Sequence, residues 1–282
     1  MTGRLSVFLA AAAVVTQILY PLVQGGARDA LTVSVVVLLA AACITHAAAT
    51  RGARWTAGLV IVTAGLGLSS EVLGTATGYP YGCYAYTADR LGPALAGVPL
   101  VVPLAWTAGF YLAWCVASVL ARGPLLRPIR ILLATIGVVG WDLYLDPQMV
   151  ADGQWTWCVA DAGLPGLEHI PLTNYAGWLL VTVVMAVAVD RIDLLIDHGV
   201  NRRIELQVDA AAPRSDGVPI GLFLWTWLGS ALAHSVFLGA PELRYSAMYG
   251  WIVMGILGVP LLISLMRQRA RQPWTYDTRP RT

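Results

Sequence analysis

Eight long apolar segments dominate this chain of 282 residues. A helix needs about 20 residues to cross the hydrocarbon core of a bilayer, and each segment is near that length. The segments are Leu5–Val23, Ala30–Thr50, Trp55–Gly74, Val98–Ala121, Ile129–Asp146, Tyr175–Ile196, Ile220–Gly239 and Ala247–Met266. Charged residues make up only 12% of the chain, which is about half of their share in soluble domains. The sequence therefore predicts an all-α, polytopic integral membrane bundle of about eight transmembrane helices, with residues 1–282 as a single membrane domain.

The positions of the arginines predict the orientation of this bundle. All 18 basic residues are arginine, and cytoplasmic loops of membrane proteins are enriched in basic residues. With the N-terminus in the cytoplasm, Arg28, Arg90 and Arg244 fall on the outer side and the other fifteen on the inner side. An even number of helices leaves both termini inside. We expect a multi-pass protein of the cell membrane, and the scattered charges indicate no nucleic-acid partner.

The first apolar segment contains the polar residues Thr16 and Gln17, and no small-residue cleavage site follows it. We therefore expect it to remain as the first helix. Of the connections, residues 197–218 have the polarity of a cytoplasmic loop and residues 267–282 that of a basic cytoplasmic tail.

Two connections on the predicted outer side, residues 75–97 and 147–174, are rich in aromatic residues, glycine and proline. Loops of this length in a compact protein are usually functional. We expect both to fold back as lids and to cover an active site near the outer leaflet.

Three acidic residues lie at the outer ends of predicted helices. Asp142 and Asp146 are spaced i, i+4 and so share one helix face, while Glu71 lies in the third apolar segment. Acidic residues inside a membrane are rare and are usually functional. A carboxyl group in a low-dielectric environment favours its protonated form and can donate that proton to a weak base such as an alkene. The alternative is a structural role in hydrogen bonding between helices, and Asp146 with Pro147 also fits the end of the fifth helix.

Aromatic residues surround both outer loops. Near the first loop they are Tyr79, Tyr81, Tyr84, Tyr86 and Trp106. Near the second they are Trp141, Tyr144, Trp155, Trp157, Tyr175 and Trp178. Two interpretations stay open: the aromatic belt of the membrane interface, or a lining whose π faces stabilise a carbocation.

Several familiar site patterns are missing from the sequence. The histidines His46, His169 and His234 do not have the spacing of a di-iron site, and no Asp-Asp-x-x-Asp motif suggests bound magnesium. No glycine-rich dinucleotide motif occurs. We expect no metal and no cofactor.

Four cysteines divide into two groups. Cys43 and Cys115 fall inside apolar segments and suit packing. Cys83 and Cys158 lie one in each outer loop, on the oxidising side, where a disulfide between them would join the loops.

Several sequence blocks resemble the carotenoid hydratase family of bacteria and archaea. These blocks are GTATGYPYGCYAYT at 74–87, LGP at 91–93, GVP at 97–99, PLAW at 103–106, DLYLDPQMV at 142–150, GQWTW at 153–157 and PLTNYAGW at 171–178. The resemblance extends over roughly residues 55–265.

The resemblance implies a membrane enzyme that adds water to the terminal double bond of an acyclic carotenoid without a redox cofactor. It implies Asp142, Glu71 and Asp146 as candidate catalytic acids. The candidate substrate-binding residues are Tyr79, Tyr81, Tyr84, Tyr86, Trp106, Trp141, Trp155, Trp157, Asn174 and Trp178. A lipophilic carotenoid or terpene would be the substrate, and other enzymes of carotenoid biosynthesis would be possible partners.

Two other interpretations remain. A membrane terpene or carotenoid cyclase would begin with the same protonation of an alkene. A transporter or a scaffold protein would also carry acidic residues in its helices.

Overall fold

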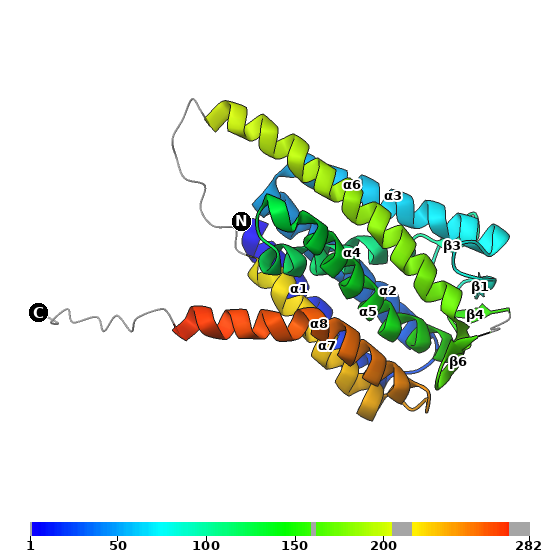
Figure 1. Cartoon of the computed structure of the whole chain (residues 1–282). Coiled ribbons are helices and arrows are strands. Elements are labelled where there is room, and N and C mark those ends of the chain that lie inside the picture. Colours follow the sequence, from blue (N-terminus) through cyan, green and yellow to red (C-terminus); the bar gives the residue numbers. More distant parts are fainter. Residues whose placement is uncertain (1, 159–161, 205–215, 271–282) are drawn as a thin grey trace, which may run out of the picture.

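A computed structural model describes residues 2–158, 162–204 and 216–270 and contains eight α-helices over these residues. The helices are α1 (Thr2–Leu19), α2 (Gly26–Arg51), α3 (Ala53–Thr77), α4 (Val102–Leu120), α5 (Arg127–Ala151), α6 (Leu172–Ile204), α7 (Gly217–Leu232) and α8 (Leu243–Ala270). Short helical turns are η1 (Tyr20–Leu22), η2 (Pro124–Leu126) and the π-helical turn η3 (Ala233–Phe237). Figure 1 shows the helices running alongside one another, with the strands gathered at one end.

The predicted all-α polytopic bundle is confirmed. Seven helices are long and apolar enough to cross a membrane, and α6 packs in the same bundle against α3 and α5. The direction of the bundle across the membrane stays a prediction. Parts of the predicted cytoplasmic loop 197–218 and tail 267–282 lie outside the described residues.

The fifth helix is longer than predicted, because Pro147 does not end it. Proline removes one helical hydrogen bond and leaves the carbonyl four residues earlier without its donor. Here that carbonyl belongs to Leu143, and it accepts a hydrogen bond of 2.6 Å from the Ser246 hydroxyl on α8. With this replacement the helix continues to Ala151, and Asp146 lies inside it rather than at its end.

The connections α3–α4 and α5–α6 form a lid over the end of the bundle, made of residues 78–101, 152–158 and 162–171. Its strands are β1 (Tyr84–Tyr86), β2 (Ala94–Leu95), β3 (Val98–Pro99), β4 (Trp155–Trp157), β5 (Gly163–Leu164) and β6 (Leu167–Pro171). Strand β1 pairs antiparallel with β4, whereas β2–β3 and β5–β6 are pairs within one connection. The two predicted loops are therefore joined by a strand pair that the sequence analysis did not predict.

A disulfide bond between Cys83 and Cys158 lies next to the β1–β4 pair, and it forms the bridge that the sequence analysis left open. The backbone N–H of Cys158 also donates to the carbonyl of Cys83 at 2.8 Å. The other two cysteines, Cys43 and Cys115, are buried and free, as expected for packing residues.

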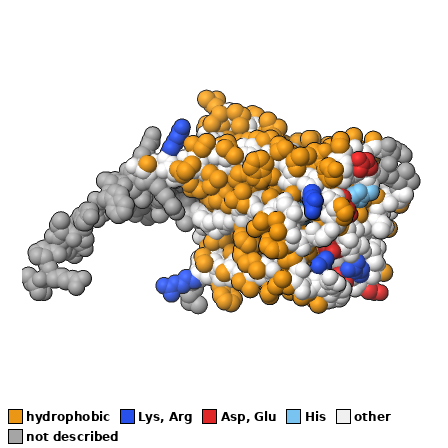
Figure 2. Space-filling view, turned by 90° about the horizontal axis from the view of Figure 1, so that it is seen from below, with side chains coloured by type: hydrophobic (Ala, Val, Ile, Leu, Met, Phe, Trp, Pro, Cys, Tyr) orange, Lys and Arg blue, Asp and Glu red, His pale blue; other side chains and the backbone are white. Residues whose placement is uncertain are grey.

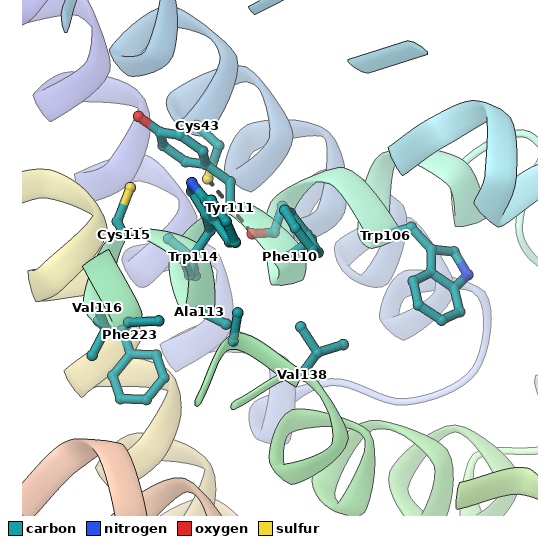
Figure 3. Packing of buried hydrophobic residues seen from close by; sticks show 14 of the residues in the cluster. Cys43, Trp106, Phe110, Tyr111, Ala113, Trp114, Cys115, Val116, Val138 and Phe223 are labelled. Carbon is teal, nitrogen blue, oxygen red and sulfur yellow. Dashed lines mark hydrogen bonds between the residues drawn. The ribbon is translucent and has the colours of Figure 1, made fainter. Parts of the chain in front are cut away.

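Helix α4 forms the centre of the core, and most of its side chains are buried (Figure 3). Two glycines allow tryptophan rings to lie directly on helix backbones. A Cβ atom at Gly109 of α4 would come within 2.1 Å of the Trp141 ring, and one at Gly67 of α3 within 2.7 Å of Trp106. Both tryptophans therefore take positions that a larger residue would block.

The outer surface of the bundle is largely apolar. Figure 2 shows hydrophobic side chains over the middle of the visible face, with acidic and basic side chains toward the lid end and basic side chains at the opposite end. Ile61 of α3, for example, is 72% exposed. A soluble monomer rarely exposes continuous apolar surface on this scale, so the surface indicates contact with lipid.

We expect the Cys83–Cys158 bond to stabilise the lid. Removing a native disulfide typically costs about 2–4 kcal/mol of folding free energy. Reductant should lower the apparent unfolding temperature of the purified protein by several degrees, because about 2–4 °C is lost per kcal/mol in a chain of this size. The Cys83→Ser/Cys158→Ser variant should already unfold at the lower temperature, and reductant should not change that temperature further. The Cys43→Ser variant should respond to reductant as the wild type does. Equal unfolding temperatures of the wild type with and without reductant would contradict this role.

Candidate active site

A cavity of about 470 Å³ lies beneath the lid, inside the bundle. All the site residues predicted from the sequence line it except Tyr79. They are Glu71, Tyr81, Tyr84, Tyr86, Trp106, Trp141, Asp142, Asp146, Trp155, Trp157, Asn174 and Trp178. Tyr79 is 64% exposed and does not reach the cavity, so the prediction that it helps to line the site is wrong.

Glu71 is buried and accepts hydrogen bonds from three different side chains. The Tyr84 and Tyr86 hydroxyls donate to its Oε2 at 2.5 and 2.8 Å. The Trp106 indole donates to its Oε1 at 3.0 Å. Both carboxyl oxygens of Glu71 are therefore held in place by donors, two of them from the lid.

The two aspartates of α5 are joined by one amide. Asn174, at the start of α6, donates from Nδ2 to Asp142 Oδ2 at 2.9 Å and to Asp146 Oδ2 at 3.0 Å. Asp146 also accepts a hydrogen bond of 2.6 Å at its Oδ1 from the Trp155 indole of the lid. Asp146, like Glu71, has both oxygens occupied.

Asp142 differs from the other two acids. It is 1% exposed, and its Oδ1 has no hydrogen-bond partner among the described residues. A buried polar atom without a partner is costly and rare in native structures. Asp142 lines the cavity, and its Oδ1 is the one oxygen of the three carboxyl groups without a hydrogen-bond partner among the described residues.

The lid presents its aromatic residues to the acids through strand alternation. Successive side chains of a strand point to opposite faces, so Tyr84 and Tyr86 share one face of β1. In the β1–β4 register they stand opposite Trp157 and Trp155, and all four line the cavity. Burial raises the pKa of the Tyr84 and Tyr86 hydroxyls above the usual value, and the neighbouring Glu71 charge adds to this. Both hydroxyls therefore remain protonated and able to donate at neutral pH.

Three tryptophans from the helices also line the cavity. Trp106 of α4 stacks on Trp178 of α6, with ring centroids 3.8 Å apart and an interplanar angle of 17°. Trp141 of α5 meets Trp178 edge-on at 6.1 Å. These rings lie inside the bundle, so they line a cavity and do not form part of an interfacial belt.

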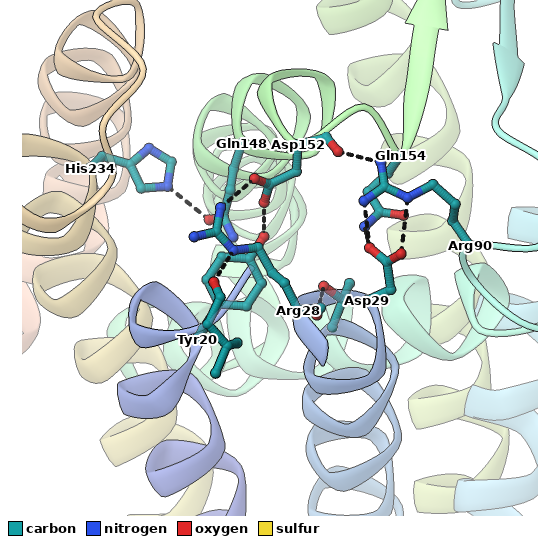
Figure 4. A network of polar contacts seen from close by, with 10 residues as sticks. Tyr20, Arg28, Asp29, Arg90, Gln148, Asp152, Gln154 and His234 are labelled. Atoms are coloured by element: carbon teal, nitrogen blue, oxygen red, sulfur yellow. Dashed lines mark hydrogen bonds and ion pairs between the residues drawn. The ribbon is translucent and has the colours of Figure 1, made fainter. Parts of the chain in front are cut away.

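Sequence analysis missed a polar network beside the cavity (Figure 4). The Tyr20 hydroxyl donates to Asp152, which also pairs with Arg28 at 2.7 Å. Asp29 accepts hydrogen bonds of 2.6 Å from both Arg90 and Gln154 of the lid. This network ties η1 and the start of α2 to the lid. The hydrogen bonds that Arg90 donates to Asp29 raise the pKa of the Arg90 guanidinium.

Gln148 of α5 also lines the cavity and was missed. Its Oε1 lies 2.9 Å from Nε2 of His234, whose other ring nitrogen lies 2.9 Å from the Ser246 hydroxyl. His234 is therefore a buried partner between helices. Among the described residues, no group of three or more His, Cys, Asp or Glu side chains is arranged to hold a metal ion.

The fold and the site define a class: a polytopic membrane protein with a buried, acid-bearing cavity walled by aromatic rings. Residues 31–211 match the model of a family described as carotenoid biosynthesis protein, and the chain belongs to that family. The resemblance inferred from the sequence motifs is confirmed.

A curated relative is similar over part of the chain. It is the bisanhydrobacterioruberin hydratase of Haloarcula japonica, 38% identical over 151 residues, which are 52% of this chain and 46% of the relative. The chain thus matches about half the length of that relative. No solved structure matches the chain.

The hydrogen bonds that hold Glu71 predict a measurable effect on stability. Tyr84→Phe keeps the ring but removes one donor to a buried carboxyl group, and such bonds contribute about 1.5–3 kcal/mol. We expect a clear decrease in the apparent unfolding temperature of the purified protein. Tyr79→Phe, at an exposed tyrosine outside the cavity, should leave it unchanged. If the two variants unfold at the same temperature, the Tyr84–Glu71 bond does not stabilise the site.

Proposed function

We propose that this protein adds water to the terminal double bond of an acyclic carotenoid end group by acid catalysis, without a cofactor. The observation that carries this proposal is that Asp142 lines an aromatic cavity and that its buried Oδ1 has no hydrogen-bond partner among the described residues. The family match and the partial similarity to a hydratase support the same reaction and substrate class.

The hydrogen bonds divide the acids by role. Two carboxylates one helical turn apart repel each other, so a pair of this kind tends to share one proton. Both oxygens of Asp146 accept hydrogen bonds, whereas one oxygen of Asp142 has no hydrogen-bond partner among the described residues. We therefore assign the shared proton to Asp142 Oδ1 and the role of proton donor to Asp142.

The proposed reaction is balanced with water as the only co-reactant. Asp142 transfers its proton to the less substituted carbon of the terminal double bond, and a tertiary carbocation forms. A water molecule bonds to the cationic carbon and releases one proton. The Asp142–Asp146 pair takes this proton back, so that polyene and water give a tertiary alcohol and the acid is restored.

The walls of the cavity suit the cationic intermediate. Aromatic faces attract cations, and the attraction is strongest for tryptophan. The stacked Trp106 and Trp178, with Trp141 at their edge, present such faces. Glu71, held by three donors, lies beside Trp106, and Glu71 or Asp146 would orient the attacking water.

The lid places this chemistry at one end of the bundle. With the orientation predicted from the arginines, that end lies near the outer leaflet of the cell membrane. A site at that depth is near water and is also open to lipid, and hydration of an apolar polyene needs both.

Product analysis tests the reaction. Expression in a host that makes lycopene should yield carotenoids heavier by one water per modified end, detected by liquid chromatography and mass spectrometry. A product of unchanged mass with altered absorption would overturn hydration in favour of cyclisation. An unchanged carotenoid profile, with the protein present in the membrane, would support a transporter or a scaffold protein.

Conservative variants test the acids. Asp142→Asn keeps shape but removes the proton donor, and we expect product formation to fall by about 10²–10⁴-fold, the usual contribution of general acid catalysis. Glu71→Gln should also lower it. The matched controls are Asp89→Asn and Glu168→Gln, at exposed lid positions, and both should retain activity. Full activity of Asp142→Asn and Glu71→Gln, in a system where the wild type is active, would refute the acid mechanism.

A further inference from the structure

The cavity opens sideways rather than through the lid. Among the residues that line it, those that are also exposed at the surface are Ile18, Leu22, Leu232 and Phe237. Their exposed fractions are 51%, 73%, 55% and 58%. The lid residues that line the cavity are buried or half-buried. The mouth of the cavity is therefore rimmed by four apolar side chains.

All four rim residues belong to two helical segments that are long and apolar enough to span a membrane, Gly3–Leu22 and Gly217–Phe237. The mouth thus lies in the seam between α1 with η1 and α7 with η3. An opening at such a seam faces the lipid and not the water. Both segments lie outside residues 31–211, the range that the family model matches.

A hydrogen bond between side chains crosses the seam. Across it, the Trp225 indole of α7 donates to Gln17 Oε1 of α1 at 2.7 Å. On the α7 side the lining includes the small residues Ser230 and Ala233 beside the larger Trp225 and Phe237. The Trp225 ring lies against Gly229, where a Cβ atom would come within 3.3 Å of it.

The lid end of the cavity is closed in contrast. The Cys83–Cys158 bond joins the two halves of the lid, and the network of Tyr20, Asp152 and Arg28 ties the lid to the start of α2. A ligand that reaches Asp142 from the bilayer would therefore pass between α1 and α7.

We propose that the α1–α7 seam is a lateral portal through which the polyene chain of the substrate enters from the bilayer. The chain remains in the portal while its end group reacts at Asp142. This inference rests on the proposed function and adds the route and the binding mode of the substrate. A cavity of about 470 Å³ is in the range that encloses a drug-sized ligand, so a long carotenoid would be enclosed only at its end.

Cysteine protection tests the portal without relying on turnover. Leu232→Cys, in the rim, and Ile61→Cys, on the exposed face of α3, would each be reacted with a lipid-soluble maleimide in proteoliposomes. The free native cysteines are buried, and the others form the disulfide. Lycopene at several times its Kd should slow alkylation of Leu232→Cys by about fivefold and leave Ile61→Cys unchanged. Equal rates for Leu232→Cys with and without lycopene would overturn the portal.

A blocked portal should select against long substrates. Ser230→Trp fills the seam, and we expect conversion of lycopene to fall by about tenfold, equivalent to about 1.4 kcal/mol of lost transition-state binding. Conversion of a short isoprenoid with the same terminal double bond should change by less than about twofold, because it needs no room in the portal. Ile61→Trp should affect neither substrate. An equal loss for long and short substrates would contradict a portal at this seam.

The two arms separate this proposal from the proposed reaction. If lycopene protects Leu232→Cys but the wild type forms no hydrated product, the portal stands and the hydratase function fails. If the wild type hydrates lycopene and Leu232→Cys is not protected, the function stands and the portal fails.

Discussion

Three carboxyl groups are buried inside an apolar bundle, and the structure around them must supply hydrogen bonds to them. A buried charge or polar group is costly unless hydrogen bonds replace the water it has lost. Glu71 and Asp146 meet this demand fully, with donors from the lid and from neighbouring helices. Asp142 meets it at only one of its oxygens. In the proposed mechanism, this unpartnered oxygen distinguishes Asp142 as the reactive acid from the other two acids, which support it.

The lid is built to supply those donors. Tyr84, Tyr86 and Trp155 lie on two short strands that neither connection forms alone, since β1 pairs with β4 of the other connection. A single two-stranded pair is only marginally stable in isolation. The Cys83–Cys158 bond at one end of the pair and the Arg90–Asp29–Gln154 contacts at the other hold it against the bundle. The disulfide bond and these polar contacts therefore hold the tyrosine hydroxyls and the Trp155 indole in position to donate hydrogen bonds to the acids.

Much of this arrangement follows from sequence patterns that depend on local chemistry. Long apolar segments predicted the helices, and the predicted topology placed Glu71 at the same end of the bundle as the aspartate pair. The features that were missed depend on distant partners. The helix continues through Pro147 because the Ser246 hydroxyl of α8 donates a hydrogen bond to the Leu143 carbonyl, which proline leaves without its helical donor. Tyr79 and Tyr81 are two residues apart, yet Tyr79 is exposed and Tyr81 is buried, with its hydroxyl 2.7 Å from that of Ser70. No pattern in the sequence indicated that Tyr20 and Gln148 would line the same cavity as the acids.

The cavity combines two environments that the proposed reaction needs at different points along one substrate. At the lid end, polar donors and three acids make proton transfer and water capture feasible. At the α1–α7 seam, the rim is apolar and exposed, and in the proposed portal it faces the bilayer. A polyene that lies across both would keep most of its length in a lipid-like environment and expose only its terminal double bond to the acids. Selectivity for the end of the chain would then follow from the depth of the cavity, because an internal double bond could not reach Asp142 without drawing the chain through a closed lid.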